Sequence, residues 1–288
     1  MRPSILKLLN PDIIVEMLEM ANRLEDWNKV LNTAGILHSY AQCIYEERQY
    51  HKAKGLPVPL MDMQRPLVYY FGFSHLMRGI AYQKQQKYDE AREMIYRYAE
   101  LGWMEDLGVE GETIAEEFRG LARANLYMVD ILSGKNGLLE EYRCFLQDHP
   151  EELLPGLGTI LQAAVDYGLD VDDLLHTFAE QSAGFGDYED AGNLSYYLNY
   201  CYHLALYHKR GGRLPEAMDW MMQALRLAHQ SRHDSNFKRC LASFEALRGK
   251  VTAEESRRYD EVLADCLAQV VLGLHEPPDA GVQIRIFS

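Results

Sequence analysis

A chain of 288 residues, of which 48% are hydrophobic, is long enough to bury one large core or an elongated stack of helix pairs. Its formal net charge of −14 at pH 7 argues against nonspecific binding to nucleic acid or anionic lipid, because the mean field of the chain repels phosphate. The sequence contains neither a run of about 20 apolar residues nor the pattern of a signal peptide, so we expect a cytoplasmic protein with no membrane partner.

Residues that favour helices dominate, and strict alternation of Val, Ile and Thr is almost absent. This composition predicts an all-α fold. The cysteines are odd in number, widely spaced and set in apolar helical contexts, which indicates reduced thiols in the core: Cys43, Cys144, Cys201, Cys240 and Cys266.

The first 55 residues predict helices that pack on or cap the rest of the chain. Asn10 is available as an N-cap and Pro11 suits a first helical turn. A longer helix begins at about Asp26, with apolar residues advancing by three and four. Glycine and prolines then predict a connector over residues 56–65.

Residues 67–100 predict a helical hairpin with a turn at Gln85–Lys87. Small and aromatic residues recur in it at helical spacings: Gly79, Tyr82, Tyr88, Ala91 and Ile95. A small residue allows two helices to approach, and this arrangement resembles a tetratricopeptide repeat, although His75 and Arg78 stand where that family usually has Trp and Leu.

Gly108 and Gly111 predict a turn before a helix from about Glu112 to Leu132, and the glycines of 133–137 predict a break. A shorter helix up to His149, a helix pair over 153–168 and 171–185, a second repeat over 191–230, and helices over 235–248 and 253–274 follow in order. Together they predict a repeat domain over 66–275, a right-handed α-solenoid of antiparallel helix pairs. Residues 276–288 predict an extended tail.

Several motifs are better explained by turns and helix caps than by ligand or metal binding. Gly156 with Gly158, and Gly184 with Gly186, are expected to be loop glycines, because no strand precedes them as a dinucleotide fingerprint requires. Two acidic and histidine clusters favour helix capping over metal binding: Asp170, Asp172, Asp173 and His176; and His229, His233 and Asp234. Since no local catalytic signature is present, we predict no enzyme, no cofactor and no metal site.

The candidate ligand-binding residues are polar and aromatic side chains within otherwise apolar helices, because such groups on the concave wall of a helical array can hydrogen-bond an extended peptide. The alternative is that they satisfy one another or neighbouring turns. The set is Gln83, Arg123, Asn125, Tyr127, Tyr196, Asn199, His203 and Tyr207.

Residues 66–230 resemble the helical-repeat sensor regions of Gram-positive, peptide-responsive transcription regulators of the quorum-sensing type. The resemblance is carried by Leu101-Gly-Trp103, by the run FRGLARANLYMVDILSGKNGLLEEYRCFL, and by the segment from His149 to Gly158. The resemblance implies a short peptide ligand and a homodimer. It also implies DNA contact only through a helix-turn-helix domain, which we do not expect in this chain. The chain is then expected to be a sensor region or to act through a partner protein.

Two alternatives remain open at this point. The chain could be a constitutive scaffold for a protein partner, or a response-regulator phosphatase, for which Gln42 and Gln49 lie on the corresponding long helix without a local catalytic signature. The alternating tail, Val282–Phe287, is also expected to lie across the binding groove of this chain or of a neighbour.

Overall fold

The computed structural model describes residues 10–58, 63–188, 190–231 and 234–271. Across these residues it contains 13 α-helices, a few short 3-10 turns and no strand, which confirms the all-α class. The right-handed solenoid of repeats stays a prediction. No helix within the described ranges combines the length and the apolar character needed to cross a membrane.

The chain divides into two compact units between Ser133 and Gly134. We call the described residues up to Ser133 unit 1 and those from Gly134 onward unit 2. The division falls inside the range 66–275 for which we predicted one repeat domain. The described parts of the predicted N-terminal segment 1–55 and of the connector 56–65 lie within unit 1, and the predicted tail 276–288 lies outside the described residues.

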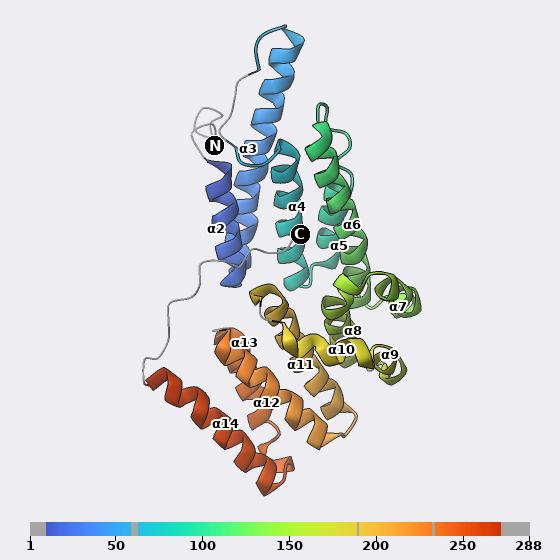
Figure 1. Cartoon of the computed structure of the whole chain (residues 1–288), viewed down its shortest axis with the longest axis vertical. Coiled ribbons are helices and arrows are strands. Elements are labelled where there is room, and N and C mark those ends of the chain that lie inside the picture. Colours follow the sequence, from blue (N-terminus) through green and yellow to red (C-terminus); the bar gives the residue numbers. More distant parts are fainter. Residues whose placement is uncertain (1–9, 59–62, 189, 232–233, 272–288) are drawn as a thin grey trace. The chain divides into compact units, whose positions relative to one another are not determined.

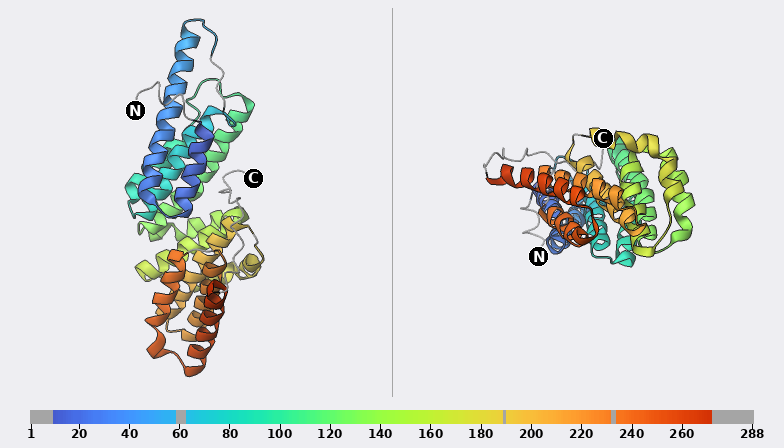
Figure 2. Two further views of the ribbon diagram at one scale, coloured as in Figure 1. Left: turned by 90° about the vertical axis from the view of Figure 1, so that its left-hand side faces the viewer. Right: turned by 90° about the horizontal axis from the view of Figure 1, so that it is seen from below.

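Unit 1 is built from helices that lie alongside their neighbours in sequence (Figures 1 and 2). Helix α4 is central, since it packs against α3, α5 and α6. The helices of unit 1 are α2 (Pro11–Arg23), α3 (Trp27–Ala53), α4 (Leu67–Lys84), α5 (Tyr88–Ala99) and α6 (Gly108–Leu132).

Unit 2 contains the second predicted hairpin, formed by α11 and α12, which packs on α8 through α11 and on α13 and α14 through α12. Its longer helices are α7 (Leu139–Asp148), α8 (Leu153–Tyr167), α11 (Ala191–Arg210), α12 (Leu214–Gln230), α13 (Asp234–Glu245) and α14 (Ala253–Val271). Its short elements are η1 (Asn136–Leu138), η2 (Pro150–Glu152), α9 (Asp172–Thr177), α10 (Ala179–Ser182), η3 (Ala183–Asp187) and η4 (Arg248–Lys250).

The predicted helix starts and stops at the N-terminus and in unit 2 are confirmed by their hydrogen bonds. The side-chain oxygen of Asn10 accepts from the N–H of Asp12 at 2.8 Å, and that of Asp26 accepts from the N–H of Lys29 at 3.1 Å. Gly168 ends α8 with a φ of 75°, a left-handed conformation that glycine adopts without strain.

The α4–α5 hairpin packs as its small residues predict. A Cβ placed on Gly79 would lie 3.5 Å from the Cβ of Met94 and 3.8 Å from the carbonyl oxygen of Ala91. The aromatic run that begins α4 is core, because every residue from Leu67 to Met77 is buried. Each of the three neighbouring helices therefore rests on α4.

The glycine predictions were wrong in two places. Helix α6 begins at Gly108, and Gly111 is buried inside it against Leu107 and Val68. Gly156 and Gly158 are not loop residues, because both lie within α8. A Cβ on Gly156 would come within 2.5 Å of Leu146, so glycine is needed there for close helix packing.

Two further predictions need correction. The segment 171–185 does not form one helix but breaks into α9, α10 and the start of η3. All five cysteines are free, and Cys201, Cys240 and Cys266 are buried as expected. Cys144, however, is exposed, because it lies on the outer face of α7, and Cys43 is only partly buried.

Candidate functional site

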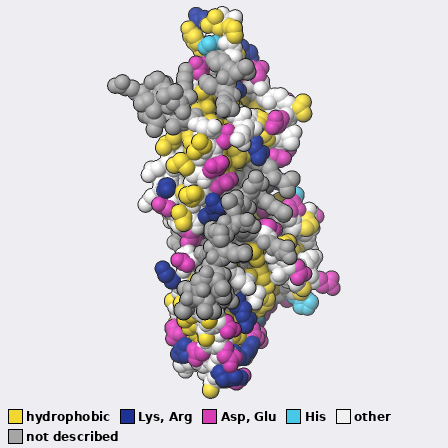
Figure 3. Space-filling view, turned by 60° about the vertical axis from the view of Figure 1, so that its left-hand side comes forward, with side chains coloured by type: hydrophobic (Ala, Val, Ile, Leu, Met, Phe, Trp, Pro, Cys, Tyr) yellow, Lys and Arg dark blue, Asp and Glu magenta, His cyan; other side chains and the backbone are white. Residues whose placement is uncertain are grey.

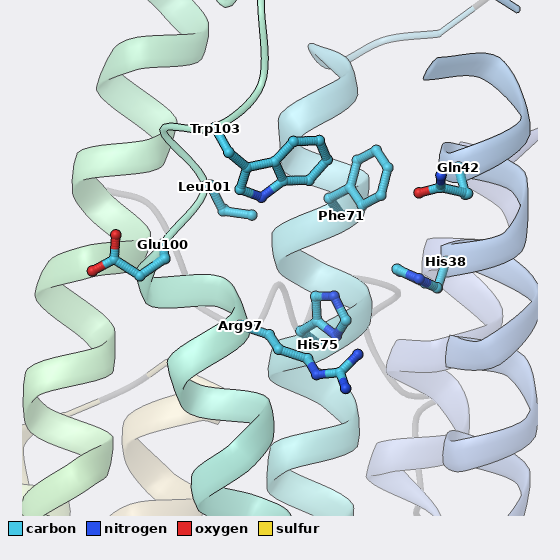
Figure 4. Close-up of a pocket in the computed structure, with 8 residues that line it drawn as sticks. All are labelled: His38, Gln42, Phe71, His75, Arg97, Glu100, Leu101 and Trp103. Atoms are coloured by element: carbon cyan, nitrogen blue, oxygen red, sulfur yellow. The ribbon is translucent and has the colours of Figure 1, made fainter. Parts of the chain in front are cut away.

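Unit 1 contains a pocket of about 350 Å³ between α3, α4 and the end of α5 (Figure 4). That volume lies within the range, roughly 300–1,000 Å³, that small-ligand sites in proteins occupy. The pocket is lined by His38 and Gln42 from α3, Phe71 and His75 from α4, and Arg97, Glu100, Leu101 and Trp103 from the end of α5 and the segment after it.

Two histidines form one wall of the pocket. The ring centroids of His38 and His75 are 4.7 Å apart, and His75 is only 5% exposed. The Nδ1 atom of each ring is buried and has no hydrogen-bond partner among the described residues. A buried polar atom without a partner is costly, so a ligand that reached these nitrogens would gain free energy by supplying the missing bond.

Both histidines are neutral near pH 7. Burial, with smaller contributions from the nearby His38, Arg78 and Arg97, lowers the pKa of His75 to about 3. Burial also lowers the pKa of His38, again with Arg78 and Arg97 contributing. A neutral imidazole has one nitrogen that donates and one that accepts, so the pair offers a ligand both kinds of bond without a fixed charge.

The adjoining wall is aromatic, and Phe71 also meets the ring of His38 edge to face at 5.5 Å. The ring of Trp103 meets that of Phe71 edge to face at 5.5 Å and that of Tyr45 at 5.2 Å. Trp103 is 52% exposed, which leaves much of the indole open to solvent. The wall is therefore suited to an apolar or aromatic side chain that would cover this ring.

Charged groups stand at the rim. Figure 4 shows the guanidinium of Arg97 reaching below His75, while the carboxylate of Glu100 turns away from the histidines. Arg97 also pairs with Glu93 at 2.5 Å on the surface of α5. Arg78 and Arg97 lie close enough to lower the pKa of both histidines, so the part of the pocket beside the histidines favours an acceptor or an anion.

The candidate residues predicted in unit 1 lie elsewhere. The side-chain amide of Asn125 donates to the hydroxyl of the buried Tyr98 at 2.8 Å, which ties α6 to α5. Arg123 is exposed on α6, Tyr127 is partly buried there, and Gln83 is partly buried at the end of α4. None of the four lines the His38–His75 pocket.

The four candidates in unit 2 share α11, but three of them face inward. Asn199 packs where α11 meets Gly158 of α8, and its carbonyl oxygen lies 2.9 Å from Nδ1 of the buried His203. Only Tyr196, 47% exposed, presents its side chain to solvent. The inward-facing side of α11 carries the other three in one row: Asn199, His203 and Tyr207. Tyr207 lies nearest the C-terminal end of the helix.

Tyr207 has an internal role. Its hydroxyl accepts from the backbone N–H of Val171 at 3.0 Å and donates to the carboxylate of Asp172 at 2.9 Å. Asp172 is held in turn by Arg213, whose guanidinium also lies 5.2 Å from the Tyr207 ring. This network holds together the turn between α8 and α9. Tyr207 therefore satisfies a neighbouring turn, which is the alternative to ligand binding that the sequence leaves open.

The remaining motifs are accounted for in the same way. The side chain of Asp170 accepts from the N–H of Asp172 at 3.1 Å, a turn-capping bond. Within the part of the chain that the structure describes, no three His, Cys, Asp or Glu side chains gather as a metal site would require, and His233 lies outside that part. Gln42 lies in the pocket and donates to Glu46 at 2.7 Å, whereas Gln49 borders a separate, small cavity.

The pocket was missed in the sequence because its residues belong to stretches that look like core. His75 was the available signal, since it is a polar residue within the aromatic run of α4. Comparison with protein-family models, with curated proteins and with solved structures gives no match to this chain.

Proposed function

We propose that this chain is a ligand-sensing helical protein whose unit 1 pocket binds one end of a short signalling peptide. In this proposal it belongs with the tetratricopeptide-like sensor regions of peptide-responsive transcription regulators, acts in the cytoplasm, and controls an attached or associated DNA-binding module. The observation that carries the proposal is the pair of buried, unpartnered imidazole nitrogens in a pocket with an aromatic wall.

The pocket supports a peptide end better than a long peptide laid along a groove. Its volume of about 350 Å³ accommodates one or two residues. An apolar side chain would cover Trp103 and Phe71, while a terminal carboxylate would accept from the guanidinium of Arg97 and from the donor nitrogen of His75. We therefore assign the pocket to the C-terminal residue of the peptide.

Ligand binding would be transmitted through helix packing. The pocket is formed by three helices, so a ligand that contacts all of them favours one relative arrangement of α3, α4 and α5. In a chain built of hairpins that contact their neighbours, such a bias passes to the adjoining helix pair. This gives the sensor a physical route from ligand to effector.

The test is calorimetric titration of the whole chain with a pool of short synthetic peptides, each prepared with a free and with an amidated C-terminus. We expect heat of binding for some free-carboxylate peptides and a loss of affinity of roughly tenfold in Arg97→Ala, which corresponds to removal of one charge-assisted bond. Amidation of the same peptides should weaken binding to a similar degree.

Arg257→Ala is the matched control. Arg257, like Arg97, is an exposed arginine paired with a glutamate one helical turn away, and it lies in α14 of unit 2. Its replacement should leave the affinity unchanged. A peptide pool that gives no heat of binding with the wild-type chain would contradict the proposal. An equal loss of affinity in both arginine variants would show that the peptide does not bind in this pocket.

A constitutive scaffold is the second candidate, and it is favoured by apolar side chains exposed along α2. A scaffold would hold its protein partner in the absence of any peptide. Pull-down of a partner that is equally efficient with and without the bound peptide would favour the scaffold over the sensor.

A further inference from the structure

Helix α2 has two apolar faces, and only one of them is used within the chain. The first face, formed by Ile14, Leu18 and Ala21, is buried, and α2 packs on α3. A second face lies roughly 100° further around the helix, given 100° per residue. Its members, of which Leu24 is the C-cap residue directly after α2, are between 46% and 69% exposed: Ile13, Met17, Met20 and Leu24.

The outer face has the spacing of a helix that packs lengthwise on another helix. Its four residues advance by four, three and four positions, which is the a and d spacing of a coiled-coil seam. We call these four residues the α2 seam. Figure 3 shows hydrophobic side chains gathered on the face of unit 1 that carries α2. Isolated exposed apolar residues are ordinary on protein surfaces, but a continuous seam indicates a partner helix.

We propose that the α2 seam pairs with the same seam of a second copy of this chain, in antiparallel orientation about a two-fold axis. In this arrangement Ile13 lies opposite the partner subunit's Leu24, and Met17 lies opposite the partner subunit's Met20. A two-fold axis repeats each of these layers, so every seam residue gains an apolar neighbour.

The charges beside the seam favour this partner and this orientation. Glu16 and Arg23 occupy equivalent positions along one edge of the seam, and both are exposed. When the helices run antiparallel, Glu16 comes beside the partner subunit's Arg23, and the two-fold axis produces the pair twice. A parallel pairing would instead put the two Glu16 side chains on opposite edges of the seam, where neither meets an Arg23.

The size of the seam sets the strength of the association. Four side chains on each copy bury less than the 1,200 Å² or so of total surface that stable interfaces usually reach. We therefore expect a weak dimer that forms as the protein concentration rises. This inference does not depend on the proposed peptide, because no pocket residue lies on α2.

Sedimentation velocity of the full chain over a wide concentration series tests the proposal. The wild-type chain should shift from monomer to dimer as concentration rises, and Met17→Glu should remain monomeric. Glu16→Arg and Arg23→Glu should each weaken the dimer about tenfold, since each creates two like-charge contacts. The double variant Glu16→Arg/Arg23→Glu should restore the wild-type association, because the exchanged charges again face one another.

Glu90→Arg, an exposed charge reversal on α5, is the matched control and should associate as the wild type does. Circular dichroism should show the same helical content in every variant, because all the substituted side chains are exposed or half exposed. A wild-type chain that stays monomeric throughout the series would overturn the proposal. Association that Met17→Glu leaves unchanged would also overturn it, and so would a double variant as weak as the single ones.

Discussion

The imidazole rings of His38 and His75 lie 4.7 Å apart where α3 meets α4, and the Nδ1 atom of each is buried with no partner among the described residues. Two adjacent histidines of this kind cannot both carry a proton, because burial and the nearby arginines oppose the charged form. The same two residues that line the proposed binding site should therefore also make the stability of unit 1 depend on pH.

The first prediction concerns pH. The pKa of His75 falls from 6.5 in the unfolded chain to about 3 in the folded one, so between these values the unfolded chain binds a proton that the folded chain does not. The free energy of unfolding should therefore decrease as pH falls below 6.5, by about 2 kcal/mol at about pH 5 for this one group.

Urea unfolding at neutral and at acid pH, followed by tryptophan fluorescence, measures this dependence. Because His75→Phe removes the group and leaves the carboxylates in place, its free energy of unfolding should fall by about 2 kcal/mol less than that of the wild type. Identical pH dependence in both proteins would show that His75 titrates normally in the folded state.

The second prediction compares two helical glycines of unit 1. A Cβ on Gly72 would lie 2.2 Å from the ring of Phe118, which is fully buried, whereas a Cβ on Gly35 would meet nothing within 4 Å. Gly72→Ala should lower the free energy of unfolding by about 1–3 kcal/mol through overpacking. Gly35→Ala should raise it by about 0.5–1 kcal/mol, because alanine is the better helix former.

Thermal or urea unfolding of the two variants side by side provides the measurement. A stabilising effect of Gly72→Ala would mean that α4 and α6 are not in close contact at this position.

The third prediction concerns the turn between α8 and α9. Tyr207→Phe removes the acceptor of the buried Val171 N–H, so it should cost about 1–3 kcal/mol of stability. Tyr196→Phe on the same helix is the control, and it should change stability by less than about 0.5 kcal/mol because the side chain is half exposed. Equal effects of the two substitutions on urea unfolding would argue against the Tyr207 network.

The fourth prediction concerns thiol reactivity. Burial raises the pKa of Cys201 and of Cys240 to about 12, so neither forms a reactive thiolate near neutral pH. Iodoacetamide should modify the exposed Cys144 first and reach these two only after denaturant is added. Peptide mass spectrometry at successive times gives the order, and early modification of Cys201 would contradict the packing of α11.

The sequence by itself determined the helical class, the helix starts at Asn10 and Asp26, and the close approach at Gly79. Each of these depends on interactions that span a single turn or one hairpin, where spacing along the chain gives position in space. The α2 seam was also readable in this way, since its period is local.

Only the tertiary structure decided which side chains meet across helices. Helical periodicity gives the angle at which a side chain leaves its own helix, but not the rotation and shift of the helix that packs against it. Small differences in that packing placed His75 beside His38 and sent the Tyr207 hydroxyl to the backbone of Val171. For this reason the pocket arose among residues that looked like core, while three of the four candidate residues of α11 turned inward.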